Sequence, residues 1–483
     1  MTAVHPANGA RVSTPARPPR RPPRVWIAVA LACALAACAD PGGTGPPADP
    51  GFRTAQPALA AGLGTATVQP ILSVGDTVPG GFVFPPTPDG LGGYAEGGRL
   101  ILFSNHEIGS AGVAGTDGVA KFAYARVSRL VLDRATANVL GGSYAVDGSG
   151  GYRSFCSATF ADAAVGFPGG WFLTGEEVIG AGKDGMQLAV SKAGQVVEMP
   201  WMGRFAHENT VAIPGFGGRV VLAGLDDHRG QSELYLYVAA NESEVLAGQG
   251  TLYVFTSAQA ANVGQLAVGQ GVDGRFVAIP SAASLTSAQL QAAVDGMGAL
   301  RFAGIEDGDY DRRGGLSSPT LYFVDTGSGT VPSSTAPWDP FGSIYRVEFQ
   351  AADPTRARLT LLARSQGPAS GWASPDNVGT SARSLMLQED PAHSAWARAP
   401  RIWRFPLAAD GALGAPQAVA EVLDPACSYS SGICWESSGI VDASAWLGEG
   451  TWLFDVQAHD RPEPRLGIAR ESGQLLTLKV PGS

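Results

Sequence analysis

Adjacent acidic residues recur in this chain at the ends of short apolar runs, and an unpaired cysteine precedes the first strong pair. The cysteine is Cys156, and the pairs are Glu176-Glu177, Asp226-Asp227, Glu306-Asp307 and Glu389-Asp390. Carboxylates that lie close together repel one another, so a fold that gathers them needs a counter-charge. The chain has only 33 Lys and Arg for 43 Asp and Glu. The sequence therefore predicts a multivalent metal ion, for which carboxylate oxygens are good ligands.

Short runs rich in Val, Leu, Tyr and Phe, separated by Gly, Pro, Asn and Asp, predict β-strands over most of the chain. The clearest are residues 99–103, 127–132, 171–174, 219–224, 234–238, 251–255, 320–325, 344–349, 401–405 and 451–456. One segment, 287–295, predicts a helix, because Thr286 and Gln289 form a capping box ahead of an apolar stripe. The chain has more predicted short strands than a β-sandwich contains, which favours a β-propeller with four strands per blade.

The spacing of the acidic pairs also favours a propeller. Successive pairs lie 50 to 83 residues apart, which corresponds to one to two blades of about 40–45 residues. Each pair would then lie at an equivalent edge of a different blade and face an axial tunnel. Neighbouring side chains of a regular strand face opposite ways, so both members can face inward only where a strand ends or bulges. The alternative, solvated acids in turns, is disfavoured by the recurrence of the pairs at strand ends.

The N-terminal segment predicts export. Residues 1–24 are rich in Pro and Arg, and residues 25–37 form an apolar run of the length of a signal-peptide core. The run ends in Leu35-Ala36-Ala37-Cys38, which resembles a bacterial lipobox with Cys38 as the lipidated residue. We expect a lipoprotein signal peptide over 1–37, a Pro/Gly/Ala tether over 38–57 and one propeller domain over 58–483, held at the cell envelope through Cys38. The alternative is an ordinary signal peptide in which Cys38 is incidental.

The net charge and the cysteines limit the binding partners and the chemistry that the sequence predicts. Loss of residues 1–37 removes five arginines and no acids, which leaves a formal charge of −15 and makes nucleic acid and anionic lipid poor partners. In an oxidising compartment, a disulfide is the favoured use of Cys427 and Cys434. Cys156 is then left alone, either buried as a small apolar residue or used chemically. We expect a monomer.

Several segments, in order along most of the mature chain, resemble the PhoX-type alkaline phosphatases. They are Asn105-His106-Glu107; Cys156 followed by 170–177; 203–208; Asp226-Asp227 ahead of 234–237; Glu306-Asp307; and Ser374-Pro375-Asp376-Asn377 leading to Glu389-Asp390. The resemblance implies a secreted six-bladed β-propeller with a metal-lined central tunnel that carries Ca2+ and Fe3+. It also implies a small phosphate ester as the substrate, hydrolysed with the help of the metal ions.

Carried over position by position, the resemblance assigns candidate roles to residues. It gives an iron-binding set, because a thiolate mixed with carboxylates suits iron better than calcium: Cys156, Glu176, Glu208 and Glu306. It gives oxygen donors for calcium, with Asp226 and Asp390 as further metal candidates: Glu177, Asp227, Asp307, Asp376, Asn377 and Glu389. It gives catalytic candidates: Asn105, His106 and Glu107. His106 and His207 each precede a glutamate, which favours an orienting role for the two imidazoles.

One departure from the family pattern concerns phosphate recognition. Family members resembling this chain have Arg-Pro directly before the glutamate that corresponds to Glu306, where Gly304-Ile305 stand here. Arg301 is the nearest basic residue and is our candidate for the missing arginine. Two alternatives to a phosphomonoesterase therefore stay open: a non-catalytic surface propeller stiffened by calcium, and an esterase that acts on phytate or a phosphodiester.

Overall fold

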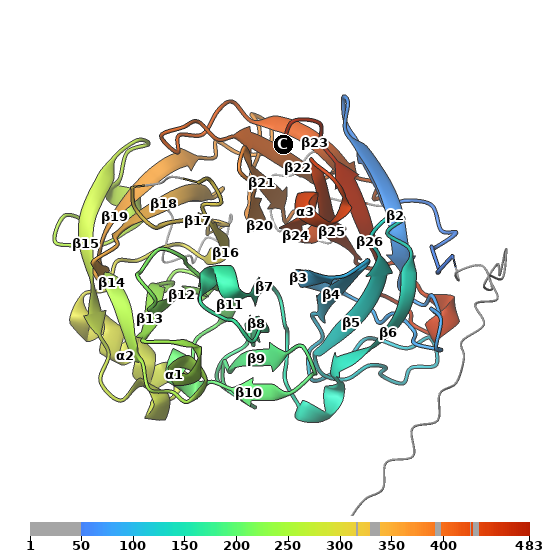
Figure 1. Cartoon of the computed structure of the whole chain (residues 1–483), viewed down its shortest axis with the longest axis horizontal. Coiled ribbons are helices and arrows are strands. Elements are labelled where there is room, and N and C mark those ends of the chain that lie inside the picture. Colours follow the sequence, from blue (N-terminus) through green and yellow to red (C-terminus); the bar gives the residue numbers. More distant parts are fainter. Residues whose placement is uncertain (1–49, 315–316, 329–338, 392–397, 426, 428–433) are drawn as a thin grey trace, which may run out of the picture. The chain divides into compact units, whose positions relative to one another are not determined.

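The computed structural model describes residues 50–314, 317–328, 339–391, 398–425, 427 and 434–483. These residues are mostly β-strand, with a few short helices between the strands. The sheets are antiparallel and are arranged around a common centre like the blades of a propeller (Figure 1). The predicted all-β class is therefore confirmed. The predicted signal peptide, Cys38 and most of the tether lie outside the described residues.

Four of the sheets are separate and short. The first contains β3 (Pro88–Glu96), β4 (Arg99–His106), β5 (Arg126–Asp133) and β6 (Val139–Val146). The second contains β7 (Ala158–Ala161), β8 (Trp171–Gly175), β9 (Gln187–Ser191) and β10 (Val196–Glu198). The third contains β20 (Pro375–Thr380), β21 (Ser384–Glu389), β22 (Arg401–Pro406), β23 (Gln417–Val422) and β1 (Ala60–Gly62). The fourth contains β24 (Glu436–Asp442), β25 (Thr451–Ala458), β26 (Ser472–Lys479) and β2 (Thr67–Ser73).

A fifth sheet has nine strands. In spatial order they are β11 (His207–Ala212), β12 (Val220–Asp226), β13 (Leu234–Ala239), β14 (Thr251–Thr256), β15 (Gly271–Ala278), β19 (Asp353–Arg364), β18 (Ser343–Gln350), β17 (Thr320–Asp325) and β16 (Ile305–Tyr310). Hydrogen bonding between β15 and β19 joins the two halves of this sheet. The structure thus shows a propeller-like arrangement of four sheets and one larger sheet, in place of the six separate blades that we expected.

Helices are few and short in the described residues. The α-helices are α1 (Glu242–Leu246), α2 (Ser287–Met297) and α3 (Ser444–Leu447), and the 3-10 turns are η1 (Gly148–Gly150), η2 (Ala163–Val165), η3 (Pro200–Met202), η4 (Val263–Gln265), η5 (Ala282–Ser284) and η6 (Pro464–Leu466). The predicted helix is confirmed as α2, and its Thr286–Gln289 capping box is present. Across the described ranges, no helix is long and apolar enough to cross a membrane.

Strands from the N-terminal part of the chain complete two sheets that are otherwise built from its C-terminal part. β1 pairs with β23, and β2 pairs with β26 along most of its length. This pairing covers sheet edges that would otherwise be open. The predicted disulfide is confirmed, because Cys427 and Cys434 are bonded with an S–S distance of 2.01 Å.

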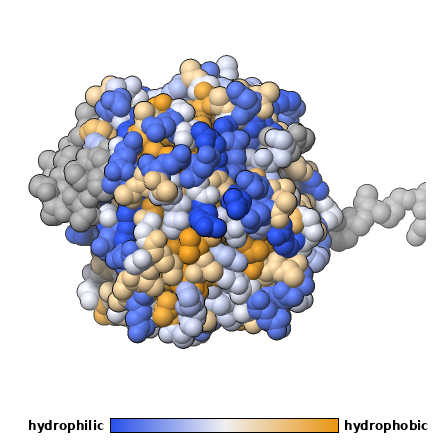
Figure 2. All heavy atoms as spheres, turned by 90° about the vertical axis from the view of Figure 1, so that its left-hand side faces the viewer, coloured by the Kyte–Doolittle hydropathy of each residue, from blue (hydrophilic) through white to orange (hydrophobic). Residues whose placement is uncertain are grey.

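The hydrophobic core lies between neighbouring sheets. β12 is buried along its whole length, because its side chains alternate between two hydrophobic clusters that cover the two faces of its sheet, and it accordingly reads as an apolar run. Between the first two sheets, Phe103 stacks on Phe160 and Phe172 with ring centroids 5.9 and 5.2 Å apart. The outer side that carries β15 and β19 interleaves polar residues with small groups of apolar ones (Figure 2).

The four separate sheets and the two halves of the nine-stranded sheet are six sheet segments. The first strand of each segment in chain order lies nearest the centre and contacts the first strands of the two neighbouring segments. These inner strands follow one another as β3, β7, β11, β16, β20 and β24, and β24 contacts β3 again. Residues at the ends of the inner strands are therefore brought together at one end of the ring.

Candidate metal centre

A repeated β-bulge sets the direction of the acidic side chains on the inner strands. In β3 the pairing with β4 jumps from Pro88↔His106 to Leu91↔Ser104, and similar register shifts occur at the start of β11, β16 and β20. A bulge leaves residues unpaired and re-aims their side chains. The first unpaired residue of each bulge is acidic: Asp89, Glu208, Glu306 and Asp376.

A second set of acids follows the second strand of four of the sheet segments, and a repeated backbone hydrogen bond fixes these residues. The N–H of each donates to a carbonyl just before the inner strand at 3.0 Å: Glu107 to Thr87, Glu177 to Ser154, Asp227 to Ala206 and Asp390 to Ser374. Thr87, Ser154 and Ser374 have φ of 47°, 46° and 42°. Such positive φ values are strained in non-glycine residues and are frequent at functional sites.

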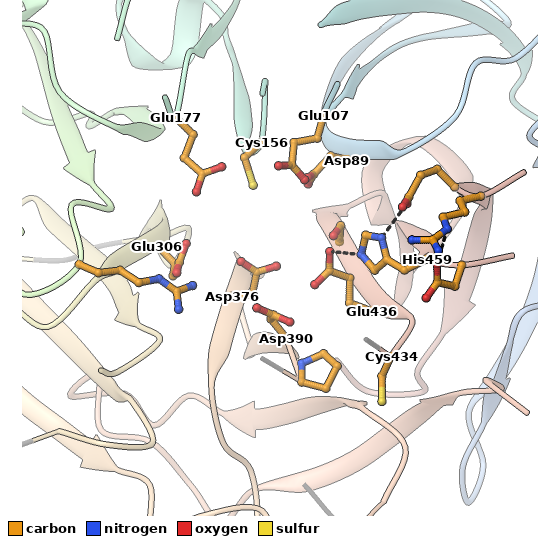
Figure 3. Close-up of a pocket in the computed structure, with 16 residues that line it drawn as sticks. Asp89, Glu107, Cys156, Glu177, Glu306, Asp376, Asp390, Cys434, Glu436 and His459 are labelled. Atoms are coloured by element: carbon orange, nitrogen blue, oxygen red, sulfur yellow. Dashed lines mark hydrogen bonds and ion pairs between the residues drawn. The ribbon is translucent and has the colours of Figure 1, made fainter. Parts of the chain in front are cut away.

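Most acids of the two sets line a cavity of about 420 Å³ at the centre of the ring (Figure 3). Its walls are Asp89, Glu107, Cys156, Glu177, Arg229, Glu306, Asp376, Asp390, Pro391, Cys434, Glu436, Ser438, His459, Asp460, Arg470 and Glu471. The ligand atoms within each of three overlapping groups lie within 4.8 Å of one another: Asp89, Glu107 and Cys156; Cys156, Glu177 and Glu208; Glu208, Glu306 and Asp376. Cys156 and Glu208 therefore link the groups into one continuous chain of donors.

Burial and mutual repulsion make these groups poor acids in the absence of a cation. Burial, followed by Asp89 and Glu208, raises the pKa of the Cys156 thiol well above its ordinary value. Burial, followed by Glu436, raises the pKa of Asp390 to about 8. Burial raises the pKa of Asp227 to about 6. A bound cation would reverse these shifts, because it favours the ionised form of each ligand.

The donor set fits a metal ion. Among the described residues, three buried oxygens of this set lack a hydrogen-bond partner: Asp89 Oδ1, Glu208 Oε2 and Asp227 Oδ1. Buried polar atoms are nearly always partnered, so oxygens left over in a cluster of carboxylates indicate a cation site. The Cys156 sulfur lies among these oxygens, so the site offers soft and hard ligands together.

Polar side chains behind the cavity fix the position of the donors. Asn105 donates to the backbone oxygens of Cys156 and Ser157 at 2.7 and 3.1 Å. Asn377 donates to the Ser157 hydroxyl at 2.7 Å, and that hydroxyl donates to Glu208 Oε1 at 2.7 Å. These side chains orient the candidate ligands, a role that commonly surrounds metal sites.

Comparison with known proteins agrees with this geometry. The family model of alkaline phosphatase PhoX matches residues 189–412. The resemblance to the PhoX family is confirmed. Pseudomonas fluorescens PhoX, solved with vanadate as a transition state analogue, has a TM-score of 0.61 to this chain at 13% identity, covering 89% of this chain and 97% of that one. This likeness shows that the fold is shared.

A protein of unknown function from Dyadobacter fermentans is more distant, with a TM-score of 0.44 at 9% identity over 86% of this chain and 99% of that one. No curated protein sequence matches this chain significantly. The PhoX match includes Glu208, Glu306, Asp376 and Asp390, whereas Cys156 lies N-terminal to it.

The expectation that both members of each acidic pair face the tunnel is wrong. Glu177 lines the cavity, but the Glu176 carboxylate is turned away and accepts hydrogen bonds from the N–H groups of Arg153 at 2.9 Å and Met186 at 3.2 Å. The reason is the alternation of side chains, because consecutive residues at a strand end still face opposite ways. Glu176 is therefore not brought to the donor cluster.

Two other pairs also have one member that does not face the cavity. Asp390 lines the cavity, whereas Glu389 accepts from the Ala373 N–H at 2.9 Å and forms an ion pair with Arg398 at 2.7 Å. Asp226 is buried on the side of β12 away from the cavity, with Glu233 beside its carboxyl group.

Two predicted calcium donors hold neighbouring inner strands together instead of facing the cavity. Asp307 accepts from Asn209 and from the Val378 N–H at 3.0 Å. The Asn377 oxygen accepts from the Gly439 N–H at 3.0 Å. Each is the second unpaired residue of its bulge, so its side chain faces the next strand.

The predicted catalytic residues also divide. Glu107 lines the cavity. The His106 ring is buried and hydrogen-bonds to Pro86 O at 2.8 Å and to Ser128 Oγ at 2.6 Å. Burial lowers its pKa to about 3, so the ring is neutral and links β4 to the segment before β3 and to β5. Arg301 does not reach the cavity, because its guanidinium is bound by Glu233 and Asp295.

Several cavity residues were missed by the sequence reasoning, chief among them Asp89 and Arg229. An internal repeat could have shown the first, because Thr87-Pro88-Asp89-Gly90 parallels Ser374-Pro375-Asp376-Asn377. No comparable signal marks Arg229. Glu436 and His459 also line the cavity, and His459 bridges Glu436 and Glu471 at 3.1 and 2.7 Å.

Proposed function

We propose that this protein is a metal-dependent phosphatase that hydrolyses small phosphomonoesters in the central cavity. The observation that carries the proposal is the continuous chain of buried carboxylates and one thiol, with oxygens that lack partners among the described residues. The match to the PhoX family supports the phosphatase class.

The donors divide into two kinds of candidate site. Glu208, Glu306 and Asp376 offer only carboxylate oxygens and would suit Ca2+. Cys156, Glu177 and Glu208 mix a thiolate with carboxylates and would suit Fe3+. When bound, such cations polarise a phosphoryl oxygen and lower the pKa of the attacking water.

The chain's own residues supply positioning and charge balance. The deep burial of Cys156 and Glu208 excludes bulk water from one side of the cavity. The cavity wall also carries His459. Burial lowers the pKa of His459, but its hydrogen bonds to Glu436 and Glu471 outweigh this effect and raise the pKa well above its ordinary value, which favours the protonated ring. The imidazolium offsets part of the negative charge there and keeps both carboxylates in place.

We further infer six blades, with the nine-stranded sheet counted as two blades joined through β15 and β19. The closed succession of inner strands supports this inference. We retain the signal peptide over 1–37, the tether over 38–57 and lipidation at Cys38 as proposals, together with a monomeric propeller over 58–483. Cys38→Ala should move the protein from the membrane fraction to the soluble fraction, and unchanged membrane retention would contradict lipidation.

Metal analysis and turnover measured on the same preparation test the function. We expect calcium and iron in the mature protein, hydrolysis of an aryl phosphate, loss of activity on chelation and its return with Ca2+. Folded, metal-loaded protein without turnover would refute the proposal in favour of a calcium-stiffened binder. Preference for phytate or a phosphodiester would keep the cavity chemistry but change the substrate class.

A further inference from the structure

One position in the repeated backbone pattern around the cavity carries no charge. The N–H of Thr326 donates to Gly304 O at 2.9 Å, just as Asp390 donates to Ser374 O and Glu107 to Thr87 O. Thr326 thus occupies, after β17, the place that an acid occupies in the equivalent segments. The segment after β17 therefore lacks the acid that follows the second strand in the equivalent segments.

Arg229 lies beside this gap. A Cβ atom on Gly304 would be 2.7 Å from Asp227 Oδ1, 3.5 Å from Thr326 Cγ2 and 3.6 Å from Arg229 Cγ. The absence of a side chain at residue 304 thus leaves room for the loop after β12. The Gly230 N–H donates to Ala303 O at 2.6 Å and fixes this loop against the segment that precedes β16.

The Arg229 guanidinium is charged and accessible from the cavity. Its side chain is 51% exposed, and its ion pair with Asp227 joins Nε to Oδ2 at 3.7 Å, which is longer than a hydrogen bond. The other candidate, Arg301, is held by Glu233 and Asp295.

We propose that Arg229 binds the phosphoryl group of the substrate in the central cavity, whose wall it forms beside the position where Thr326 stands in place of an acid. The proposal rests on the phosphatase function proposed above. A guanidinium presents a planar fork of N–H donors that matches two phosphate oxygens, which a Lys ammonium cannot reproduce. In a cavity lined by acids, such a cation on the wall gives a phosphate anion a place to bind.

Phosphate binding and turnover of three variants test this role. Arg229→Ala should raise both the KM for an aryl phosphate and the Kd for inorganic phosphate on the order of 10- to 100-fold, or about 1.4 to 2.8 kcal/mol. Arg229→Lys should recover part of that loss, because it restores charge without the fork. Arg358→Ala is the matched control, since Arg358 is 50% exposed and pairs with Asp273 on the outer surface, and it should change neither constant.

The outcomes separate this inference from the proposed function. Unchanged phosphate affinity in Arg229→Ala would overturn the inference even if the protein is an active phosphatase. Phosphate binding that depends on Arg229, without turnover of any ester, would support the inference and refute the function. Loss of bound metal in Arg229→Ala would also overturn it, because Arg229 would then act by holding Asp227. Failure of the metal-loaded wild type to bind phosphate would overturn it as well.

Discussion

Neutralising either member of the Glu176-Glu177 pair should have opposite effects on the stability of the metal-free protein. Glu176 is fully buried, and its two oxygens accept the Arg153 and Met186 N–H groups. In Glu176→Gln the amide oxygen can serve one of these donors, while the amide nitrogen faces the other. One buried N–H group without a partner costs about 1–3 kcal/mol. Because burial also raises the pKa of Glu176, removal of its charge returns part of this cost, and we expect a net loss of about 1–2 kcal/mol.

Glu177 should behave differently. Burial, followed by Glu107 and Asp227, raises its pKa well above the ordinary value. Where the pKa of a carboxyl group is raised in the folded state, the free energy of unfolding falls as pH rises through that pKa, because the folded state disfavours the ionised form. Glu177→Gln should therefore stabilise the metal-free protein at pH 8, and the gain should vanish below about pH 4, where the carboxyl is protonated in both states. Bound metal should fall in this variant only.

Urea denaturation of chelated protein at both pH values, with metal analysis of untreated protein, measures both effects. The assignment of one clamping and one cavity-facing residue would be refuted if Glu176→Gln lost metal while Glu177→Gln kept it. Equal stability of the two chelated variants at pH 8 would refute it too.

Three further predictions use the same kind of reasoning. Asp455 is buried with Ser104 Oγ at 3.4 Å, and burial raises its pKa, so Asp455→Asn should raise the melting temperature at pH 8 but not near pH 4; an equal shift at both pH values would contradict this. Arg301→Ala leaves buried Glu233 without its ion pair and should cost about 3–5 kcal/mol in denaturant titrations, with KM unchanged; a raised KM would return Arg301 to the site. Chelation should lower the melting temperature more at pH 8 than at pH 5, because ionised carboxylates repel one another once the cation is removed; a drop independent of pH would argue against charge repulsion.

The sequence is informative about strands because each strand is a local pattern. Residues 220–225 form an apolar run because β12 is covered on both sides, and residues 451–456 became β25 for the same reason. The capping box of α2 and the Cys427–Cys434 disulfide are also short-range features. The joining of β15 to β19 is not local, so strand patterns could not predict the nine-stranded sheet.

The sequence predicts which residue types form the candidate site, but it does not predict which of their side chains face the cavity. The acidic pairs indicate a charged centre, yet the side chain that faces it depends on where a strand ends and where its partner bulges. The bulge at Pro88–Leu91 aims Asp89 at the cavity, whereas Arg301 is withdrawn by two carboxylates that come from other segments. Register and ion pairing are tertiary properties, so spacing along the chain cannot fix them.

The adjacency of the acids follows from the repeat itself. In the Glu176-Glu177 and Glu389-Asp390 pairs, the first residue accepts a backbone N–H from the segment before the inner strand, and the second residue faces the cavity. Glu389 holds Ala373 and Asp390 faces inward. After β17, Asp325 keeps the holding role through the Ala303 N–H at 2.8 Å, but the next residue is Thr326. A pair that keeps its holding acid and loses its cavity-facing acid preserves the fold while it changes local charge. The cavity therefore receives one acid fewer from this segment, next to Arg229, the residue that we propose to bind the phosphate.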